Sequence, residues 1–155
     1  MQRRQQYTII DGCTSNITQG IPQGSSLGPL LFALYIDDLP LTTKLTPTFF
    51  ADDTVLSTSG SNSTELQNKV NVELGKVNEW LRFNKLSLNY LKTSYMIVSR
   101  KNNQLIDFNV KINDKTITRT KCVKYLGVFI DDKLAWSNHI AYLEKQLSRS
   151  IGIFY

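Results

Sequence analysis

The longest regular pattern of apolar and polar positions in the chain predicts a helix over residues 63–83. Its apolar positions recur at steps of four, four, three and four residues, which is the spacing of one face of an α-helix: Leu66, Val70, Leu74, Val77 and Leu81. Ser63 is the expected N-cap, and the acidic Glu65 lies in the first turn, where the helix dipole favours it.

Two further helices are predicted, one on each side of the long one. The first begins near Pro29, because proline costs nothing in a first helical turn, and it ends before Pro40. Its expected apolar face consists of Leu30, Leu31, Leu34, Tyr35 and Leu39. The last helix is expected over residues 135–155.

Runs of β-prone residues between these helices predict strands and hairpins. Two such runs flank Asp52–Asp53 and predict a hairpin with both acids at its tip. Alternating apolar residues around Asn113–Asp114 predict a second hairpin. Residues 94–100 and 122–131 each read as one strand, and residues 6–11 as another, followed by a polar connection. This order of helices and hairpins predicts an α+β fold rather than a doubly wound parallel sheet.

Three pairs of adjacent aspartates are candidates for chemistry. Asp37–Asp38 follows a helical pattern, and Asp131–Asp132 ends a strand before Lys133, so a solvated helix end and a turn with a local counter-charge explain them. Asp52–Asp53 differs, because apolar strands flank it and no glycine shapes the turn. A divalent cation would offset the repulsion between its carboxylates, as in two-metal phosphoryl-transfer sites. The pair alone leaves a metal site and an ordinary turn both open.

Composition and charge narrow the class of protein. The 155 residues fit one domain, and 41% apolar with 20% charged residues is typical of a globular chain. A net charge of +5 moderately favours a polyanionic partner, although many ordinary domains carry such a charge. No apolar run approaches the ~20 residues of a membrane helix. Cys13 and Cys122 are few and far apart, which favours reduced thiols and an intracellular location, in cytoplasm and nucleus.

Four segments, in this order and at this spacing, resemble the reverse transcriptases of non-LTR (LINE-type) retrotransposons. They read QGIPQGSSLGPLLFALYIDDLP, FFADDTVL, WLRFNKLSLNYLKTSYMIVSR and VKYLGVFIDDKLAWSNHI. The resemblance implies an RNA-directed DNA polymerase that uses two-metal nucleotidyl transfer. It implies a partial polymerase palm over residues 1–134, with an antiparallel sheet and packed helices, followed by the start of the thumb helix over residues 135–155. Its implied partners are an RNA template, a DNA primer and dNTPs.

The resemblance also implies the catalytic residues. Asp52 and Asp53 match the family's x-A-D-D hairpin and would hold Mg²⁺, with Mn²⁺ as a possible substitute. Lys92 matches a lysine near the triphosphate tail, where an ammonium group would stabilise or protonate the leaving pyrophosphate. Leu126 and Gly127 resemble the segment that grips the primer end.

Contacts to the nucleotide and the template follow from the same resemblance. Pro22, Gln23 and Gly24 match the G-x-P-Q-G element, which would border the templating base and the incoming nucleotide. Glycine there allows close backbone approach, and glutamine hydrogen-bonds without adding charge. Phe50 and Ala51, which precede the aspartates, would share this role.

The family's first carboxylate motif, on a strand before the G-x-P-Q-G element, has no counterpart here, and the fingers are missing too. The upstream acid Asp11 lies at a strand end beside Gly12, which is the wrong context. We therefore expect this chain alone not to extend a primer and to be poorly stable, with open strand edges and apolar faces. The alternative is an inert palm remnant that binds nucleic acid weakly through its charge. Packing roles are expected for Trp80 and Trp136, and a surface or packing role on the thumb helix for His139.

Overall fold

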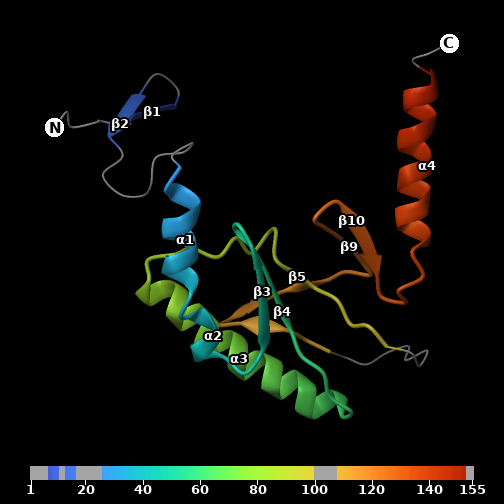
Figure 1. Cartoon of the computed structure of the whole chain (residues 1–155). Coiled ribbons are helices and arrows are strands. Elements are labelled where there is room, and N and C mark those ends of the chain that lie inside the picture. Colours follow the sequence, from blue (N-terminus) through green and yellow to red (C-terminus); the bar gives the residue numbers. More distant parts are fainter. Residues whose placement is uncertain (1–6, 11–12, 17–25, 100–107, 153–155) are drawn as a thin grey trace.

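A computed structural model describes residues 7–10, 13–16, 26–99 and 108–152 of the chain (Figure 1). Its elements, in order, are β1 (Tyr7–Ile10), β2 (Cys13–Asn16), α1 (Gly28–Ile36), α2 (Leu39–Thr42), β3 (Thr46–Phe50), β4 (Asp53–Ser57), α3 (Ser63–Phe83), β5 (Ser94–Tyr95), β6 (Lys111–Ile112), β7 (Lys115–Thr116), β8 (Thr118–Arg119), β9 (Cys122–Tyr125), β10 (Val128–Asp131) and α4 (Ser137–Gly152). Helices mixed with short sheets confirm the α+β class.

Within these ranges the strands pair two by two. The ladders β1–β2, β3–β4, β6–β7 and β9–β10 are antiparallel, whereas β5–β8 is parallel. The antiparallel sheet expected from the sequence is therefore present only as separate ladders of two to five residue pairs. No further strand pairs with the outer edges of the described ladders. Open strand edges, which the sequence predicted, are therefore present in this part of the chain.

The long helix α3 has the bounds that the periodicity predicts, but Ser63 is not its N-cap. Asn62 takes that position, and its side-chain oxygen accepts a hydrogen bond from the backbone N–H of Thr64 at 3.0 Å. The Asn62 amide group also donates to the carboxylate of Glu65 at 3.3 Å. Serine and asparagine cap helices about equally well, so the side chains alone do not decide which of two neighbours does so.

Two apolar clusters form on α3, which runs beneath the β3–β4 hairpin in Figure 1. The first contains Ile36, Leu39, Val77 and Trp80, with Phe32, Phe49, Leu56, Leu81 and Leu86 packed against it. The second contains Phe108, Val110, Ile112 and Ile117, against which Leu66, Val70 and Leu74 of α3 pack. The predicted stripe of α3 thus serves both clusters, one at each end of the helix, and Trp80 has the packing role expected of it.

Helix α1 exposes the face that the sequence analysis assigned to the core. Leu30 and Leu34 are 57% and 65% exposed, while Ile36 is buried. The helix is apolar on nearly every side, so its sequence pattern cannot select the buried face. It also ends at Ile36, and Pro40 lies in the first turn of α2 instead of terminating α1. The pair Asp37–Asp38 forms the junction, as C-cap of α1 and N-cap of α2.

Three strand predictions are corrected by the structure. Residues 122–131 form a hairpin rather than one strand, because Leu126 and Gly127 take positive φ values of +48° and +85° and reverse the chain. Of residues 94–99, only Ser94–Tyr95 is a strand, and its neighbours are half-buried or exposed. Residues Cys13–Asn16, expected as a connection, pair with β1. The hairpin around Asn113–Asp114 is confirmed.

The last helix, α4, begins two residues later than expected, at Ser137. Trp136 before it has a φ of +63°, which a helix does not allow, and residues 153–155 lie outside the described ranges. The ring of Tyr142 packs on Phe129 of β10 at 5.1 Å and beside His139 at 6.4 Å. Trp136 is 46% exposed, so its expected packing role is not met. No helix in the described ranges is long and apolar enough to span a membrane.

Candidate active site

Asp52 and Asp53 lie at the closed end of the β3–β4 hairpin. The register pairs Phe50 with Asp53, so Ala51 and Asp52 form a two-residue turn and Asp53 is the first residue of β4. Both aspartates are exposed. The predicted hairpin is confirmed, with one acid in the turn and the other at the start of the strand.

Ala51 gives this turn its shape without a glycine. Its φ is +50°, the positive value that two-residue hairpin turns require at their first position. An L-residue in the left-handed region costs roughly 1–2 kcal/mol relative to its favoured conformations. Backbone strain of this kind concentrates at functional sites, where the surrounding structure holds it in place.

The body of the hairpin is seated on α3. Phe49 of β3 and Leu56 of β4 pack against the cluster that contains Val77 and Trp80. Side chains alternate across a strand, and these two are half-buried while most of the other hairpin positions are exposed. The aspartate turn therefore projects from a ladder whose one face is packed.

An open groove runs beside the turn. It is lined by Gly28, Pro29, Phe32, Ala33 and Ile36 of α1 and by Phe49, Phe50, Ala51 and Asp52 of the hairpin. Pro22, Gln23 and Gly24 lie outside the described residues, so their expected place is not observed. The chain that follows them enters α1 at Gly28, directly beside the aspartate turn.

The other expected site residues lie elsewhere. Lys92 is exposed in a turn, where its backbone N–H donates to the carbonyl of Asn89 at 3.2 Å and to the Asn89 side chain at 3.3 Å. In the described part of the chain, no hydrogen bond or ion pair joins Lys92 to either aspartate. Leu126 and Gly127 form the exposed turn of the β9–β10 hairpin and do not line the groove.

Asp131 has a structural role that its sequence context did not indicate. It is buried, and its carboxylate accepts backbone N–H groups of Lys133, Ala135 and Trp136, each at 3.0 Å. The N–H of Ala135, together with the other two, lowers the pKa of this carboxyl. The expected turn with a lysine counter-charge is present, since the charge of Lys133 also lowers this pKa, and the backbone N–H groups are an additional and larger contribution.

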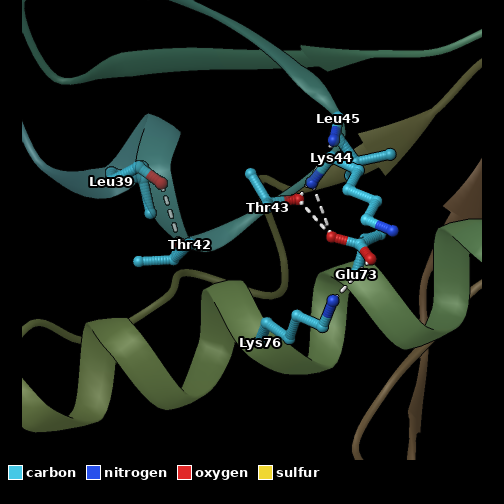
Figure 2. Close-up of polar contacts among 7 residues, drawn as sticks. All are labelled: Leu39, Thr42, Thr43, Lys44, Leu45, Glu73 and Lys76. Carbon is cyan, nitrogen blue, oxygen red and sulfur yellow. Dashed lines mark hydrogen bonds and ion pairs between the residues drawn. The ribbon is translucent and has the colours of Figure 1, made fainter.

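Sequence reasoning missed Glu73 of α3, a carboxylate that anchors the chain just before β3. Its side chain is buried and accepts hydrogen bonds from Lys76 Nζ at 2.7 Å, the backbone N–H of Lys44 at 2.6 Å and the hydroxyl of Thr43 at 3.1 Å (Figure 2). These bonds, led by that of Lys76, lower the pKa of Glu73 to about 2. The sequence did contain a sign of this role: Glu73 is a charged residue on the apolar face of the predicted helix, three residues after Val70.

The aspartate pair fits a hard divalent cation. Carboxylate oxygens are the ligands that Mg²⁺ and Mn²⁺ prefer. Among the described residues, however, no group of three or more His, Cys, Asp or Glu side chains comes together as a metal site. Asp52 and Asp53 would therefore supply two carboxylates, and Mg²⁺ normally completes such a set with water and substrate phosphates.

Comparison with known proteins assigns the class. A family described as reverse transcriptase (RNA-dependent DNA polymerase) matches residues 4–130, and the chain belongs to that family. The family uses nucleic acid templates and, in general, divalent metal. The resemblance on which the sequence interpretation rested is thus confirmed.

Three of the relatives are RNA-directed DNA polymerases of Drosophila mobile elements. The RNA-directed DNA polymerase from mobile element jockey of Drosophila melanogaster is 26% identical over 98% of this chain and 18% of its own length. A probable RNA-directed DNA polymerase from transposon X-element of the same species is 28% identical over 90% of this chain and 16% of its own length. The jockey polymerase of Drosophila funebris is 30% identical over 86% of this chain and 16% of its own length.

The chain therefore spans less than a fifth of the length of these relatives. No solved structure matches it.

Proposed function

We propose that this chain carries the carboxylate hairpin of an RNA-directed DNA polymerase, and that the longer protein performs two-metal nucleotidyl transfer. The observation that carries the proposal is the Asp52–Asp53 turn: two exposed carboxylates on a strained turn beside an open groove. Family membership supports it, as do the names of the relatives. In this proposal residues 1–134 belong to the polymerase palm and residues 135–155 begin the thumb.

Asp52 and Asp53 hold the metal in this proposal, with Mg²⁺ as the ordinary ion and Mn²⁺ as a substitute. When bound, such ions activate the attacking hydroxyl and neutralise charge on the leaving phosphates. Lys92 contributes an ammonium group that binds the triphosphate tail, and its exposed position in a turn leaves that group accessible.

The nucleic acids and the nucleotide contact the remaining residues. Pro22, Gln23 and Gly24, together with Phe50 and Ala51, border the incoming dNTP and the RNA template; the groove beside Gly28 supports this. The exposed turn of Leu126 and Gly127 contacts the DNA primer. An intracellular location, in cytoplasm and nucleus, belongs to the same proposal, supported by the free thiol of Cys122.

A Mn²⁺ titration of this chain tests the metal site. Paramagnetic broadening of amide signals should begin at residues 50–54, and Asp52→Asn should abolish it there. Asp37→Asn, in an exposed pair on another element, is the matched control and should leave the broadening unchanged. Mg²⁺ should compete only weakly, because it sheds water reluctantly and lacks substrate phosphates here. Broadening that starts near residue 37 or 131 would show that Asp52–Asp53 is not the metal-binding pair.

The polymerase reaction needs a test in the longer protein. A protein of the relatives' length that carries this segment should extend a DNA primer on an RNA template in the presence of Mg²⁺. Asp52→Asn should remove that activity and Asp37→Asn should not. Equal extension by the two variants would exclude the proposed role of Asp52.

A further inference from the structure

Glu73 is a charged side chain on the packed face of α3. Its residue is only 4% exposed, and Val70, Leu74 and Val77 surround it in the helical pattern. Figure 2 shows its carboxylate pointing away from α3 toward the segment that leads from α2 into β3. One oxygen accepts Lys76 Nζ, and the other accepts both the Thr43 hydroxyl and the Lys44 backbone N–H. The carboxylate therefore has a partner on both oxygens, and Oε2 joins α3 to the segment before β3.

The segment that Glu73 holds is itself well defined. The Thr43 hydroxyl also accepts the backbone N–H of Leu45 at 3.2 Å, and Leu45 is buried. Upstream, the Thr42 hydroxyl donates to the carbonyl of Leu39 at 2.8 Å and closes α2 (Figure 2). The start of β3 is thus fixed by the Glu73 carboxylate on one side and by the end of α2 on the other.

The second strand of the hairpin is tied to the same helix one turn earlier. Lys69 Nζ donates to the hydroxyl of Thr58, the residue after β4, at 2.9 Å. The two strands are joined there as well, because the Ser57 hydroxyl donates to the carbonyl of Thr46 at 3.3 Å. Lys69 and Glu73 are four residues apart, so they lie on one side of α3 and reach opposite strands of the open end.

Near its closed end the hairpin packs on the first apolar cluster through Phe49, and at its open end Glu73 and Lys69 hold it to α3. Ala51, Asp52 and Asp53 are all exposed, and the turn lies five residue pairs away, roughly 16 Å at 3.3 Å per residue. A small rotation at the base therefore displaces the carboxylates by a larger distance at the tip. Metal ligands must be held closely to their productive geometry by the residues that support them.

We infer that Glu73, assisted by Lys69, is a positioning residue for the Asp52–Asp53 turn. It fixes the open end of the β3–β4 hairpin against α3 and so sets the orientation in which the two carboxylates meet the metal. The inference rests on the proposed function, because it assigns Glu73 a part in that site. It extends the site from the turn to α3, a helix that carries none of the residues proposed to hold the metal or the nucleotide.

The test compares variants of this chain by Mn²⁺ titration and by amide hydrogen exchange, both well below the unfolding temperature. Glu73→Leu removes every acceptor oxygen, Glu73→Gln keeps the shape and one of them, and Lys69→Met cuts the exposed tie to Thr58. Glu79→Gln, on an exposed position of the same helix, is the matched control. The β9–β10 hairpin provides an internal control for general loosening.

Glu73→Leu should weaken Mn²⁺ binding at the turn by about tenfold, the lower end of what loss of an outer-shell partner causes. Glu73→Gln and Lys69→Met should weaken it less, and Glu79→Gln not at all. Amide exchange at residues 50–54 should accelerate in the same order, while residues 122–131 keep their protection. If Glu73→Leu does not fold, the remaining variants decide: Glu73→Gln and Lys69→Met should each weaken Mn²⁺ binding and accelerate exchange relative to the control Glu79→Gln.

Two results would overturn the inference. One is wild-type Mn²⁺ affinity and exchange at the turn in the Glu73 and Lys69 variants. The other is equal loosening of both hairpins, because that indicates only a contribution to general stability. Failure of the wild-type chain to bind Mn²⁺ at Asp52 contradicts the proposed function instead, and the exchange at residues 50–54 then decides the role of Glu73 by itself.

Discussion

At the scale of single residues, Ala51 and Glu73 show how the aspartate hairpin is held. Ala51 adopts a left-handed backbone conformation at the tip, and Glu73 ties the base to α3. Neither side chain is a candidate metal ligand in our proposal. Both shape the hairpin that presents Asp52 and Asp53, so substitutions at these two positions are informative about the fold and the site together.

Substitutions of Ala51 should follow the cost of its positive φ. Ala51→Val should lower the free energy of unfolding by about 1–2 kcal/mol, because a β-branched residue is a strong outlier in the left-handed region. Ala51→Gly should not lower it. Thr54→Val is the control, since a β-branched side chain suits an exposed strand position of the same hairpin. Chemical denaturation measures the differences, and equal stability of the Val and Gly variants would contradict the observed turn.

At the scale of elements, α3 organises the described part of the molecule. It supports an apolar cluster at each end, carries the ties to the β3–β4 hairpin and contacts β6 through its N-terminal half. Its integrity therefore affects both the candidate site and the C-terminal ladders. The N-terminus of the helix is the place where its stability can be changed without touching either cluster.

Asn62 should be the residue that caps this helix. Asn62→Ala should destabilise α3 by about 1 kcal/mol, because the side-chain acceptor for the backbone N–H of Thr64 is lost. Ser63→Ala is the matched control and should have little effect, since Ser63 is already inside the helix. The helical signal in circular dichroism during denaturation measures both. A larger effect of the Ser63 variant would restore the assignment made from sequence alone.

At the scale of the whole molecule, the described residues bury little apolar surface in two separate clusters. Large apolar side chains remain exposed on α1 and α4, among them Leu30, Leu34, Ile140 and Leu147. The expected open apolar faces are therefore present in the described part, and low stability of the isolated chain stays a prediction. In a molecule of low stability, the buried carboxylate of Glu73, with its lowered pKa, should make a visible contribution to the pH dependence of folding.

Glu73 should make the whole molecule more stable above its ordinary pKa of 4.5 than in acid. The pKa in the folded chain is about 2, so between these values the unfolded chain binds the proton and the folded chain does not. The contribution is complete above pH 4.5 and is lost as the pH falls toward 2. Glu73→Gln should flatten the stability curve in this window, relative to wild type.

Thermal unfolding at a series of pH values measures that difference. Glu79→Gln, in which an exposed carboxylate of the same helix is removed, is the control and should keep the wild-type slope. An unchanged slope in the Glu73 variant would mean that the buried hydrogen bonds do not lower the pKa of this group. Asp131, whose pKa is also lowered, remains in both variants and so cancels in the comparison.

The sequence by itself determined those features that depend on neighbours in the chain. The period of α3, the hairpins at Asp52–Asp53 and Asn113–Asp114, and the α+β class follow from local pattern and turn chemistry. The order and spacing of the four quoted segments also indicated the family, whose description matches residues 4–130. The metal-binding role of Asp52 remains a prediction.

Only the tertiary structure decided the features in which distant segments meet. Leu30 and Ile36 are both apolar, and only the packing of Ile36 in the cluster with Leu39, Val77 and Trp80 distinguishes the buried one. Glu73 receives one donor, Lys76, from its own helix, but the donors of Thr43 and Lys44 come from about 30 residues earlier in the chain. A hydrogen bond or a packed face needs two partners, and local sequence specifies only one of them.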